Sequence, residues 1–161
     1  MITIEEIKAA IKRIKDTELI ASNPSNNEKN IRFKKGNDAF SLSILDGDNV
    51  SKTKLSLLKI LNIDEKYNDF AKDAEVAANS INTSPCKVFF MSTEKLKGFF
   101  VILNIFSDKL ESFENNISEE DKVHKASVLI LSMIIETYNC ANLISSHLAK
   151  LKVDAEVANE Q

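Results

Sequence analysis

Apolar residues near the N-terminus recur at helical spacing. Four isoleucines lie three or four residues apart and so share one face of a helix. Thr3 directly precedes this stripe and Glu6 follows three residues later, which is the spacing of a capping box. We predict a first helix from residue 3 to about residue 15, followed by a loop at residues 23–27. The isoleucines are Ile4, Ile7, Ile11 and Ile14.

The pattern then changes to a period of two. Residues 31–34 and 40–44 alternate between apolar and polar, which is typical of strands with one wet face. The alternation resumes at residues 54–57 and becomes blurred over the next few positions. We predict a three-stranded antiparallel segment here, with a helix as the alternative for residues 55–63. Turn residues are expected at residues 35–38 and 46–49.

A second helix and a second hairpin follow. Asp64 is placed to cap a segment that keeps helical spacing, with several alanines, as far as Asn82. Residues 86–91 alternate with a period of two, turn residues follow, and residues 98–106 form the most β-prone run in the chain. The pattern therefore predicts a helix and then a β-hairpin.

The last long segment is helical. Ser118, with Asp121 three residues later, begins an apolar helical pattern that we expect to run to about Lys150. Between residues 128 and 135 this pattern is apolar nearly all round, as in a helix buried from more than one direction. Residues 1–150 are predicted to form a single α+β domain, and residues 151–161 a polar, frayed C-terminal tail.

Composition excludes several classes of protein. The chain has 161 residues but only 3 glycines and 2 prolines, so it holds no glycine-rich phosphate-binding loop of the P-loop or Rossmann type. Only Arg13 and Arg32 are arginine among 21 basic residues, and the net charge is −3, which argues against sequence-specific nucleic-acid binding. No signal peptide or membrane-spanning run is recognised, and we expect a cytoplasmic protein.

No catalytic or metal-binding pattern is present in the sequence. His124 and His147 have no neighbouring ligands at metal-binding spacing, and Cys140 lies two helical turns from His147. Cys86 and Cys140 fit buried small hydrophobes better than a disulfide. The acidic residues 119–121 are explained by the dipole at a helix start. We expect no enzyme activity, no cofactor and no metal.

The strand at residues 98–106 is apolar on both faces. Phe99, Val101, Leu103 and Ile105 form one face, so a helix of the same chain is expected to cover it. The other face contains Asn104 and three large hydrophobes, which we predict to form a partner or dimer surface. An ordinary core position is the alternative for them, and peptide addition at an exposed strand edge is another mode of binding. These three residues are Phe100, Ile102 and Phe106.

The order helix, three strands, helix, hairpin and long helix resembles that of bacterial type III secretion chaperones and the related YbjN-like family. The likeness is most specific in the Ala77-Ala78-Asn79-Ser80-Ile81-Asn82 helix end, the Lys87-Val88-Phe89-Phe90 and Phe99-Phe100-Val101-Ile102-Leu103 strands, and the Ser118-Glu119-Glu120-Asp121 helix start. The resemblance implies a small non-enzymatic protein. Such chaperones are homodimers that hold extended client segments, and YbjN-like members are regulators.

These observations together predict a cytoplasmic protein-binding domain that forms a homodimer or holds a protein client through apolar sheet surface. Two alternatives stay open. One is an immunity or antitoxin-type binder of a single partner, and the other is a small enzyme with an unrecognised site.

Overall fold

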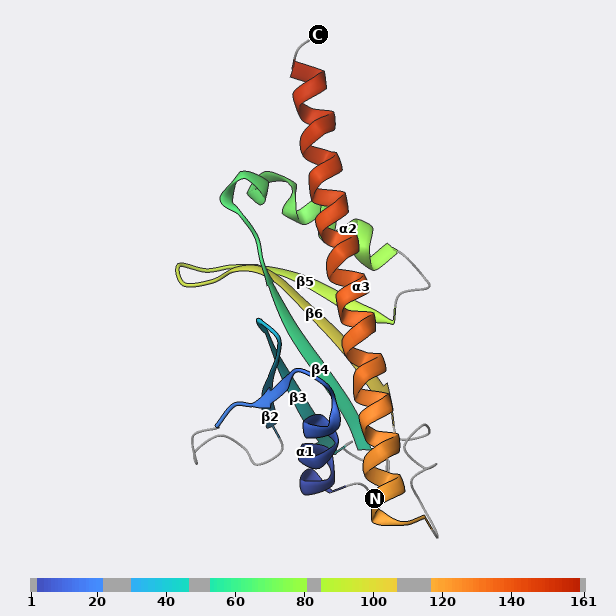
Figure 1. The fold of residues 1–161 in the computed structure, drawn as a ribbon. Coiled ribbons are helices and arrows are strands. Elements are labelled where there is room, and N and C mark those ends of the chain that lie inside the picture. Colours follow the sequence, from blue (N-terminus) through green and yellow to red (C-terminus); the bar gives the residue numbers. More distant parts are fainter. Residues whose placement is uncertain (1–2, 22–29, 47–52, 81–84, 107–116, 160–161) are drawn as a thin grey trace. The chain divides into compact units, whose positions relative to one another are not determined.

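A computed structural model describes residues 3–21, 30–46, 53–80, 85–106 and 117–159 (Figure 1). It confirms the α+β class and the long C-terminal helix. The loop predicted at residues 23–27 lies outside the described residues, as does most of the turn predicted at residues 46–49. The elements, in chain order, are α1 (Ile4–Arg13), β1 (Thr17–Leu19), β2 (Asn30–Lys35), β3 (Asp38–Asp46), β4 (Thr53–Asn62), η1 (Glu65–Phe70), α2 (Ala71–Ser80), β5 (Cys86–Ser92), β6 (Lys97–Phe106) and α3 (Glu119–Asn159).

Three elements differ from the sequence-based expectation. The short strand β1 was not predicted. The third predicted strand is confirmed, because residues 55–63 lie mostly in strand β4 and not in the alternative helix. The segment after Asp64 begins as the 3-10 helix η1 and becomes α-helical only from Ala71. The prediction that the last helix ends near Lys150 was wrong. α3 continues to Asn159, so the described part of the expected frayed tail is helical.

The strands form one six-stranded sheet in the order β1-β2-β3-β4-β6-β5. Neighbouring strands are antiparallel, and the β2–β3 register pairs Phe33 with Phe40 across the hairpin. β1 and β5 are the two edge strands, because each has a neighbour on one side only. The hairpin β5–β6 joins the sheet through β6 and leaves β5 at the edge.

The chain divides into two compact units, which are described separately below. Unit 1 comprises Met1–Leu58 and Leu103–Ile135, and unit 2 comprises Lys59–Ile102 and Glu136–Gln161. β4, β6 and α3 contribute residues to both units. The prediction of a single domain stays a prediction.

In unit 1, helix α1 begins as its sequence predicts. The Thr3 hydroxyl accepts the Glu6 N–H, and the Glu6 carboxylate accepts the Thr3 N–H, so the capping box is complete. At the other end the Thr17 hydroxyl shares its proton between the carbonyls of Ile11 and Ile14, and the Ile11 carbonyl also accepts the Ile14 N–H. Thr17, the first residue of β1, therefore caps the C-terminal end of α1 with its side chain. The core includes Ile7, Ile11, Phe33, Phe40, Ile130 and Ile134, and the two phenylalanine rings stack 5.4 Å apart.

In unit 2, strand β4 carries an unexpected buried lysine. Lys59 is buried, with its ammonium nitrogen 5.2 Å from the centre of the Tyr138 ring on α3. A charged residue on the inner face and Ile60 on the outer face reverse the usual alternation. This reversal explains why the sequence pattern at residues 55–63 was compatible with a helix as well as with a strand. Cys86 and Cys140 are buried and do not form a disulfide, as predicted.

Candidate functional site

The outer face of the sheet in unit 2 carries the predicted surface residues Phe100 and Ile102. Phe99 and Val101, which point to the other side of β6, are fully buried. Phe100 and Ile102 are only partly buried. On the neighbouring strands, Phe89 is 52% exposed, Met91 43% and Ile60 38%. We call these five residues the outer apolar face: Ile60, Phe89, Met91, Phe100 and Ile102.

The third predicted residue, Phe106, is the last residue of β6, and its side chain lies outside the described residues. The structure therefore neither adds Phe106 to the outer apolar face nor removes it. Asn104, which interrupts the apolar residues on this side of β6, belongs to unit 1. Its side-chain oxygen is buried without a hydrogen-bond partner among the described residues.

The free edge of the sheet in unit 2 is closed by helix α2. The Asn79 side chain bonds both the carbonyl and the N–H of Val88, at 2.7 and 3.0 Å. The Glu75 carboxylate accepts the Phe90 N–H at 2.8 Å. Two side chains of α2 thus take three of the backbone groups that β5 would otherwise offer to another strand. Peptide addition at this edge would first have to break these bonds, so the face is the better binding surface.

The Glu75 carboxylate combines two opposing influences. Burial by itself raises the pKa of Glu75, but the hydrogen bonds from Lys72 and from the Phe90 N–H, with the charge of Lys72, outweigh it and hold the pKa below its ordinary value. Glu75 is consequently ionised at neutral pH. An ionised carboxylate is the stronger acceptor for the strand-edge N–H.

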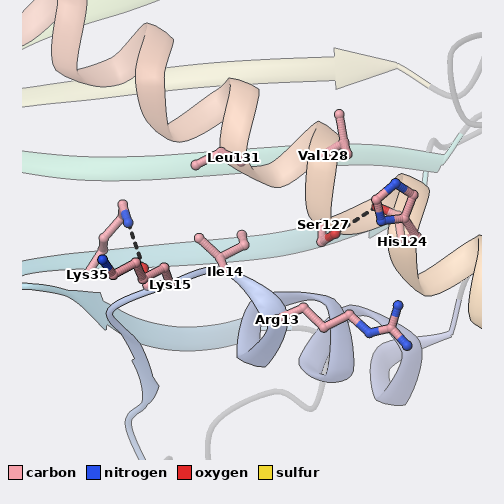
Figure 2. A pocket seen from close by; sticks show the side chains of 8 residues that line it. All are labelled: Arg13, Ile14, Lys15, Lys35, His124, Ser127, Val128 and Leu131. Atoms are coloured by element: carbon pink, nitrogen blue, oxygen red, sulfur yellow. Dashed lines mark hydrogen bonds between the residues drawn. The ribbon is translucent and has the colours of Figure 1, made fainter.

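Unit 1 contains a pocket of about 570 Å³ with a basic rim (Figure 2). Its floor is mostly apolar, and none of its lining residues is acidic. In Figure 2 the Lys35 ammonium donates to the Lys15 carbonyl at 2.7 Å, which holds that end of the rim in place. The rim consists of Arg13, Lys15, Lys35 and His124, and the floor of Ile14, Ser127, Val128 and Leu131.

The pocket lacks a nucleophile paired with a base. Ser127 is its one hydroxyl, and that hydroxyl donates to the backbone carbonyl of His124 at 2.7 Å instead of to an imidazole nitrogen. Arg13 is within 3.7 Å of the Glu120 carboxylate, a loose surface ion pair. Within the described residues, no group of three or more His, Cys, Asp and Glu side chains could hold a metal ion. The pocket is therefore suited to binding an anionic and partly apolar group.

Sequence reasoning did not find this pocket. Its residues come from the end of α1, from the β2 end at Lys35 and from the first turns of α3, which are far apart in the chain. The one local signal was the cluster of Arg13 and Lys15 beside Ile14 at the end of an amphipathic helix. Such basic residues are common at helix C-termini for electrostatic reasons alone.

Comparison with protein-family models, curated proteins and solved structures finds no match for this chain. The resemblance to YbjN-like proteins and secretion chaperones therefore stays a prediction, as does the cytoplasmic location.

Proposed function

We propose that this chain is a non-enzymatic protein-binding domain that holds an apolar segment of a protein partner on its outer apolar face. The observation that carries the proposal is the gathering of five large apolar side chains on one sheet face, three of them more than a third exposed. Contiguous exposed apolar surface of this kind marks interaction sites in soluble domains. Covering it would contribute roughly 25 cal/mol for each Å² of apolar area removed from water.

The state of the β5 edge favours binding of a partner on the outer apolar face over binding along the strand edge. Because Asn79 and Glu75 already bond the backbone of β5, a partner gains little from ladder hydrogen bonds there. Binding would depend on side-chain packing, which tolerates many apolar sequences. This favours a holding role over recognition of one exact peptide.

The two alternatives make different predictions. An immunity or antitoxin-type binder would use the same face for one partner, so its affinity would be confined to that partner. A small enzyme would need a reactive group in a cleft, and the pocket of unit 1 offers basic side chains without a paired nucleophile.

The test is a holding assay with reduced insulin, whose chains aggregate and scatter light. The wild-type protein is expected to suppress the scattering, and both Phe89→Asp and Phe100→Asp to lose that effect, because a charge on the face opposes apolar contact. Phe89 is the more exposed of the two, so its variant keeps the fold intact.

The matched control is Val76→Asp, which places the same charge on a 60% exposed valine of α2 in the same unit. It should suppress scattering as well as wild type. Equal activity of Phe89→Asp and wild type, with both folded by circular dichroism, would refute the proposed face. Absence of any holding by the wild type would refute the general holding role.

A further inference from the structure

Helix α3 has a second apolar stripe on its exposed side. Val128, Leu131 and Ile135 follow one another at helical spacing in unit 1 and are 53%, 36% and 49% exposed. Near the other end, in unit 2, Val153 and Val157 are 55% and 53% exposed. These positions lie away from the buried side chains of the helix, such as Ile130, Ile134, Ile144 and Leu148.

Both groups belong to helix α3, and its periodicity assigns them to the same side of the helix. Val128 and Val153 are 25 residues apart in the unbroken helix Glu119–Asn159, which is close to seven turns of about 3.6 residues. Between them the same side of the helix carries small or amide side chains without charge. Those positions are Asn139, Asn142, Ser146 and Ala149, and all four are exposed.

The first group of the stripe also lines the pocket of unit 1. Val128 and Leu131 form part of its floor, and the surrounding rim is basic (Figure 2). The last turns of α3 have the complementary character. Residues 153–159 present Val153 and Val157 together with Asp154 and Glu156, and they contain no basic residue.

We propose that the last turns of α3 from a second copy of this chain dock in this pocket. The partner's Val153 and Val157 pack on Leu131 and Val128, while the partner's Asp154 and Glu156 face the basic rim. Glu156 lies 3.4 Å from Lys152 of its own helix and is 62% exposed, so its carboxylate has acceptor sites left for the rim. The ligand of this pocket is thus an acidic, valine-bearing helix end.

Reciprocal docking requires the two α3 helices to run antiparallel. Val128 and Val157 lie 14 and 15 residues from Asn142, and Leu131 and Val153 lie 11 residues from it on either side. A two-fold axis near Asn142 therefore pairs apolar with apolar and polar with polar, and each copy gives and receives one helix end. Two amides meeting near the axis would favour this register over neighbouring ones.

The charges favour this orientation over a parallel one. In a parallel pair, the pocket of one copy would meet the same stretch of its partner, which contains His124 and Lys125. Basic side chains would then face a basic rim. In the antiparallel pair, the exposed Glu136 of each helix comes opposite the exposed Lys150 of the other.

A lipid bilayer is the alternative to a second copy of the chain as the environment of this apolar stripe. Among the described helices, α3 is the one with the length and apolar composition to cross a membrane, although 39% of its most apolar stretch is buried inside the protein. However, the middle of the stripe holds two asparagines and a serine, and its ends are flanked by charges. That pattern suits a helix pair with a polar centre better than hydrocarbon.

Cross-linking tests the arrangement directly. Leu131→Cys and Val153→Cys chains are prepared separately and mixed under oxidising conditions. Since the native Cys86 and Cys140 are buried, the engineered thiols are the reactive ones. We expect a disulfide dimer in the mixture that links one chain of each kind and is absent from either chain alone. Efficient cross-linking of Leu131→Cys alone would show a parallel pair and overturn the proposal.

Sedimentation supplies the second test. The wild type is expected to be a dimer, and Val153→Asp/Val157→Asp to dissociate on the order of tenfold more readily or beyond, because it adds charge to an apolar contact. Val76→Asp is again the control and should remain dimeric. A monomeric wild type, or one that floats with phosphatidylcholine vesicles through α3, would overturn the proposal. Both valines lie outside the outer apolar face, so the holding assay is expected to be unaffected by this double variant.

Discussion

The Asn79 side chain satisfies both backbone groups of Val88: its nitrogen donates to the Val88 carbonyl at 2.7 Å, and its oxygen accepts the Val88 N–H at 3.0 Å. An amide is the neutral side chain that can replace the neighbouring strand in this way, since it offers one donor and one acceptor group. Helix α2 therefore acts as a cap for the edge of the sheet.

Replacing this amide should destabilise unit 2. Asn79→Ala leaves both Val88 groups without their partner, and we expect the free energy of unfolding to fall by about 1–3 kcal/mol. Urea denaturation would measure the loss, and light scattering would report strand-edge association. Asn159→Ala, at an exposed position near the end of α3, is the control. Equal stability of the Asn79 variant and wild type would show that water replaces the amide at no cost.

Glu75 should make stability depend on acid pH. Its pKa in the folded protein is lowered, so its stabilising effect is fully present above the ordinary glutamate pKa of about 4.3 and is lost as the pH falls through the folded-state value. Urea midpoints measured from neutral pH down to about pH 3 are expected to fall less steeply for Glu75→Gln than for wild type. Asp73→Asn, on the same helix, serves as control. Parallel pH profiles for wild type and Glu75→Gln would contradict this role.

Gly98 is required by a close backbone approach. A Cβ atom at this position would lie within 3.0 Å of the Leu61 carbonyl oxygen, which cannot move as a flexible side chain could. Gly98→Ala is expected to cost about 1–3 kcal/mol by thermal or urea unfolding, because β4 and β6 would be forced apart. Gly36 provides the contrast. It has φ +57 but no atom within 4 Å of an added Cβ, so Gly36→Asn should cost clearly less.

Asn104 offers a stabilising substitution. Its buried side-chain oxygen has no partner among the described residues, which costs desolvation energy without a compensating bond. Asn104→Leu keeps the branched shape and the number of heavy atoms and removes the polar group, and we expect the free energy of unfolding to rise by about 1 kcal/mol. Asn104→Asp, which adds a charge at the same place, should lower it. A less stable leucine variant would show that this oxygen has a partner in solution.

The sequence by itself determined the elements whose cause is local. The capping box of Thr3 and Glu6, the alternation in β2 and β3 and the Ser118 start of α3 all follow from residues within one turn or one hairpin of each other. The same is true of the two-sided apolar character of β6, which drew attention to Phe100 and Ile102. These features were predictable because helical and strand periods express the nearest-neighbour geometry of the backbone.

Tertiary structure alone decided the features that depend on residues distant in the chain. The ammonium group of the buried Lys59 lies over the Tyr138 ring of α3. The alternation of apolar and polar residues in β4 therefore does not show which residues face the core unless the contact with α3 is known. The basic pocket joins α1, the end of β2 and α3, and the edge of β5 is closed by Asn79 from the preceding helix. Side-chain burial and hydrogen-bond partners are properties of the packed chain, and no period along the sequence encodes them.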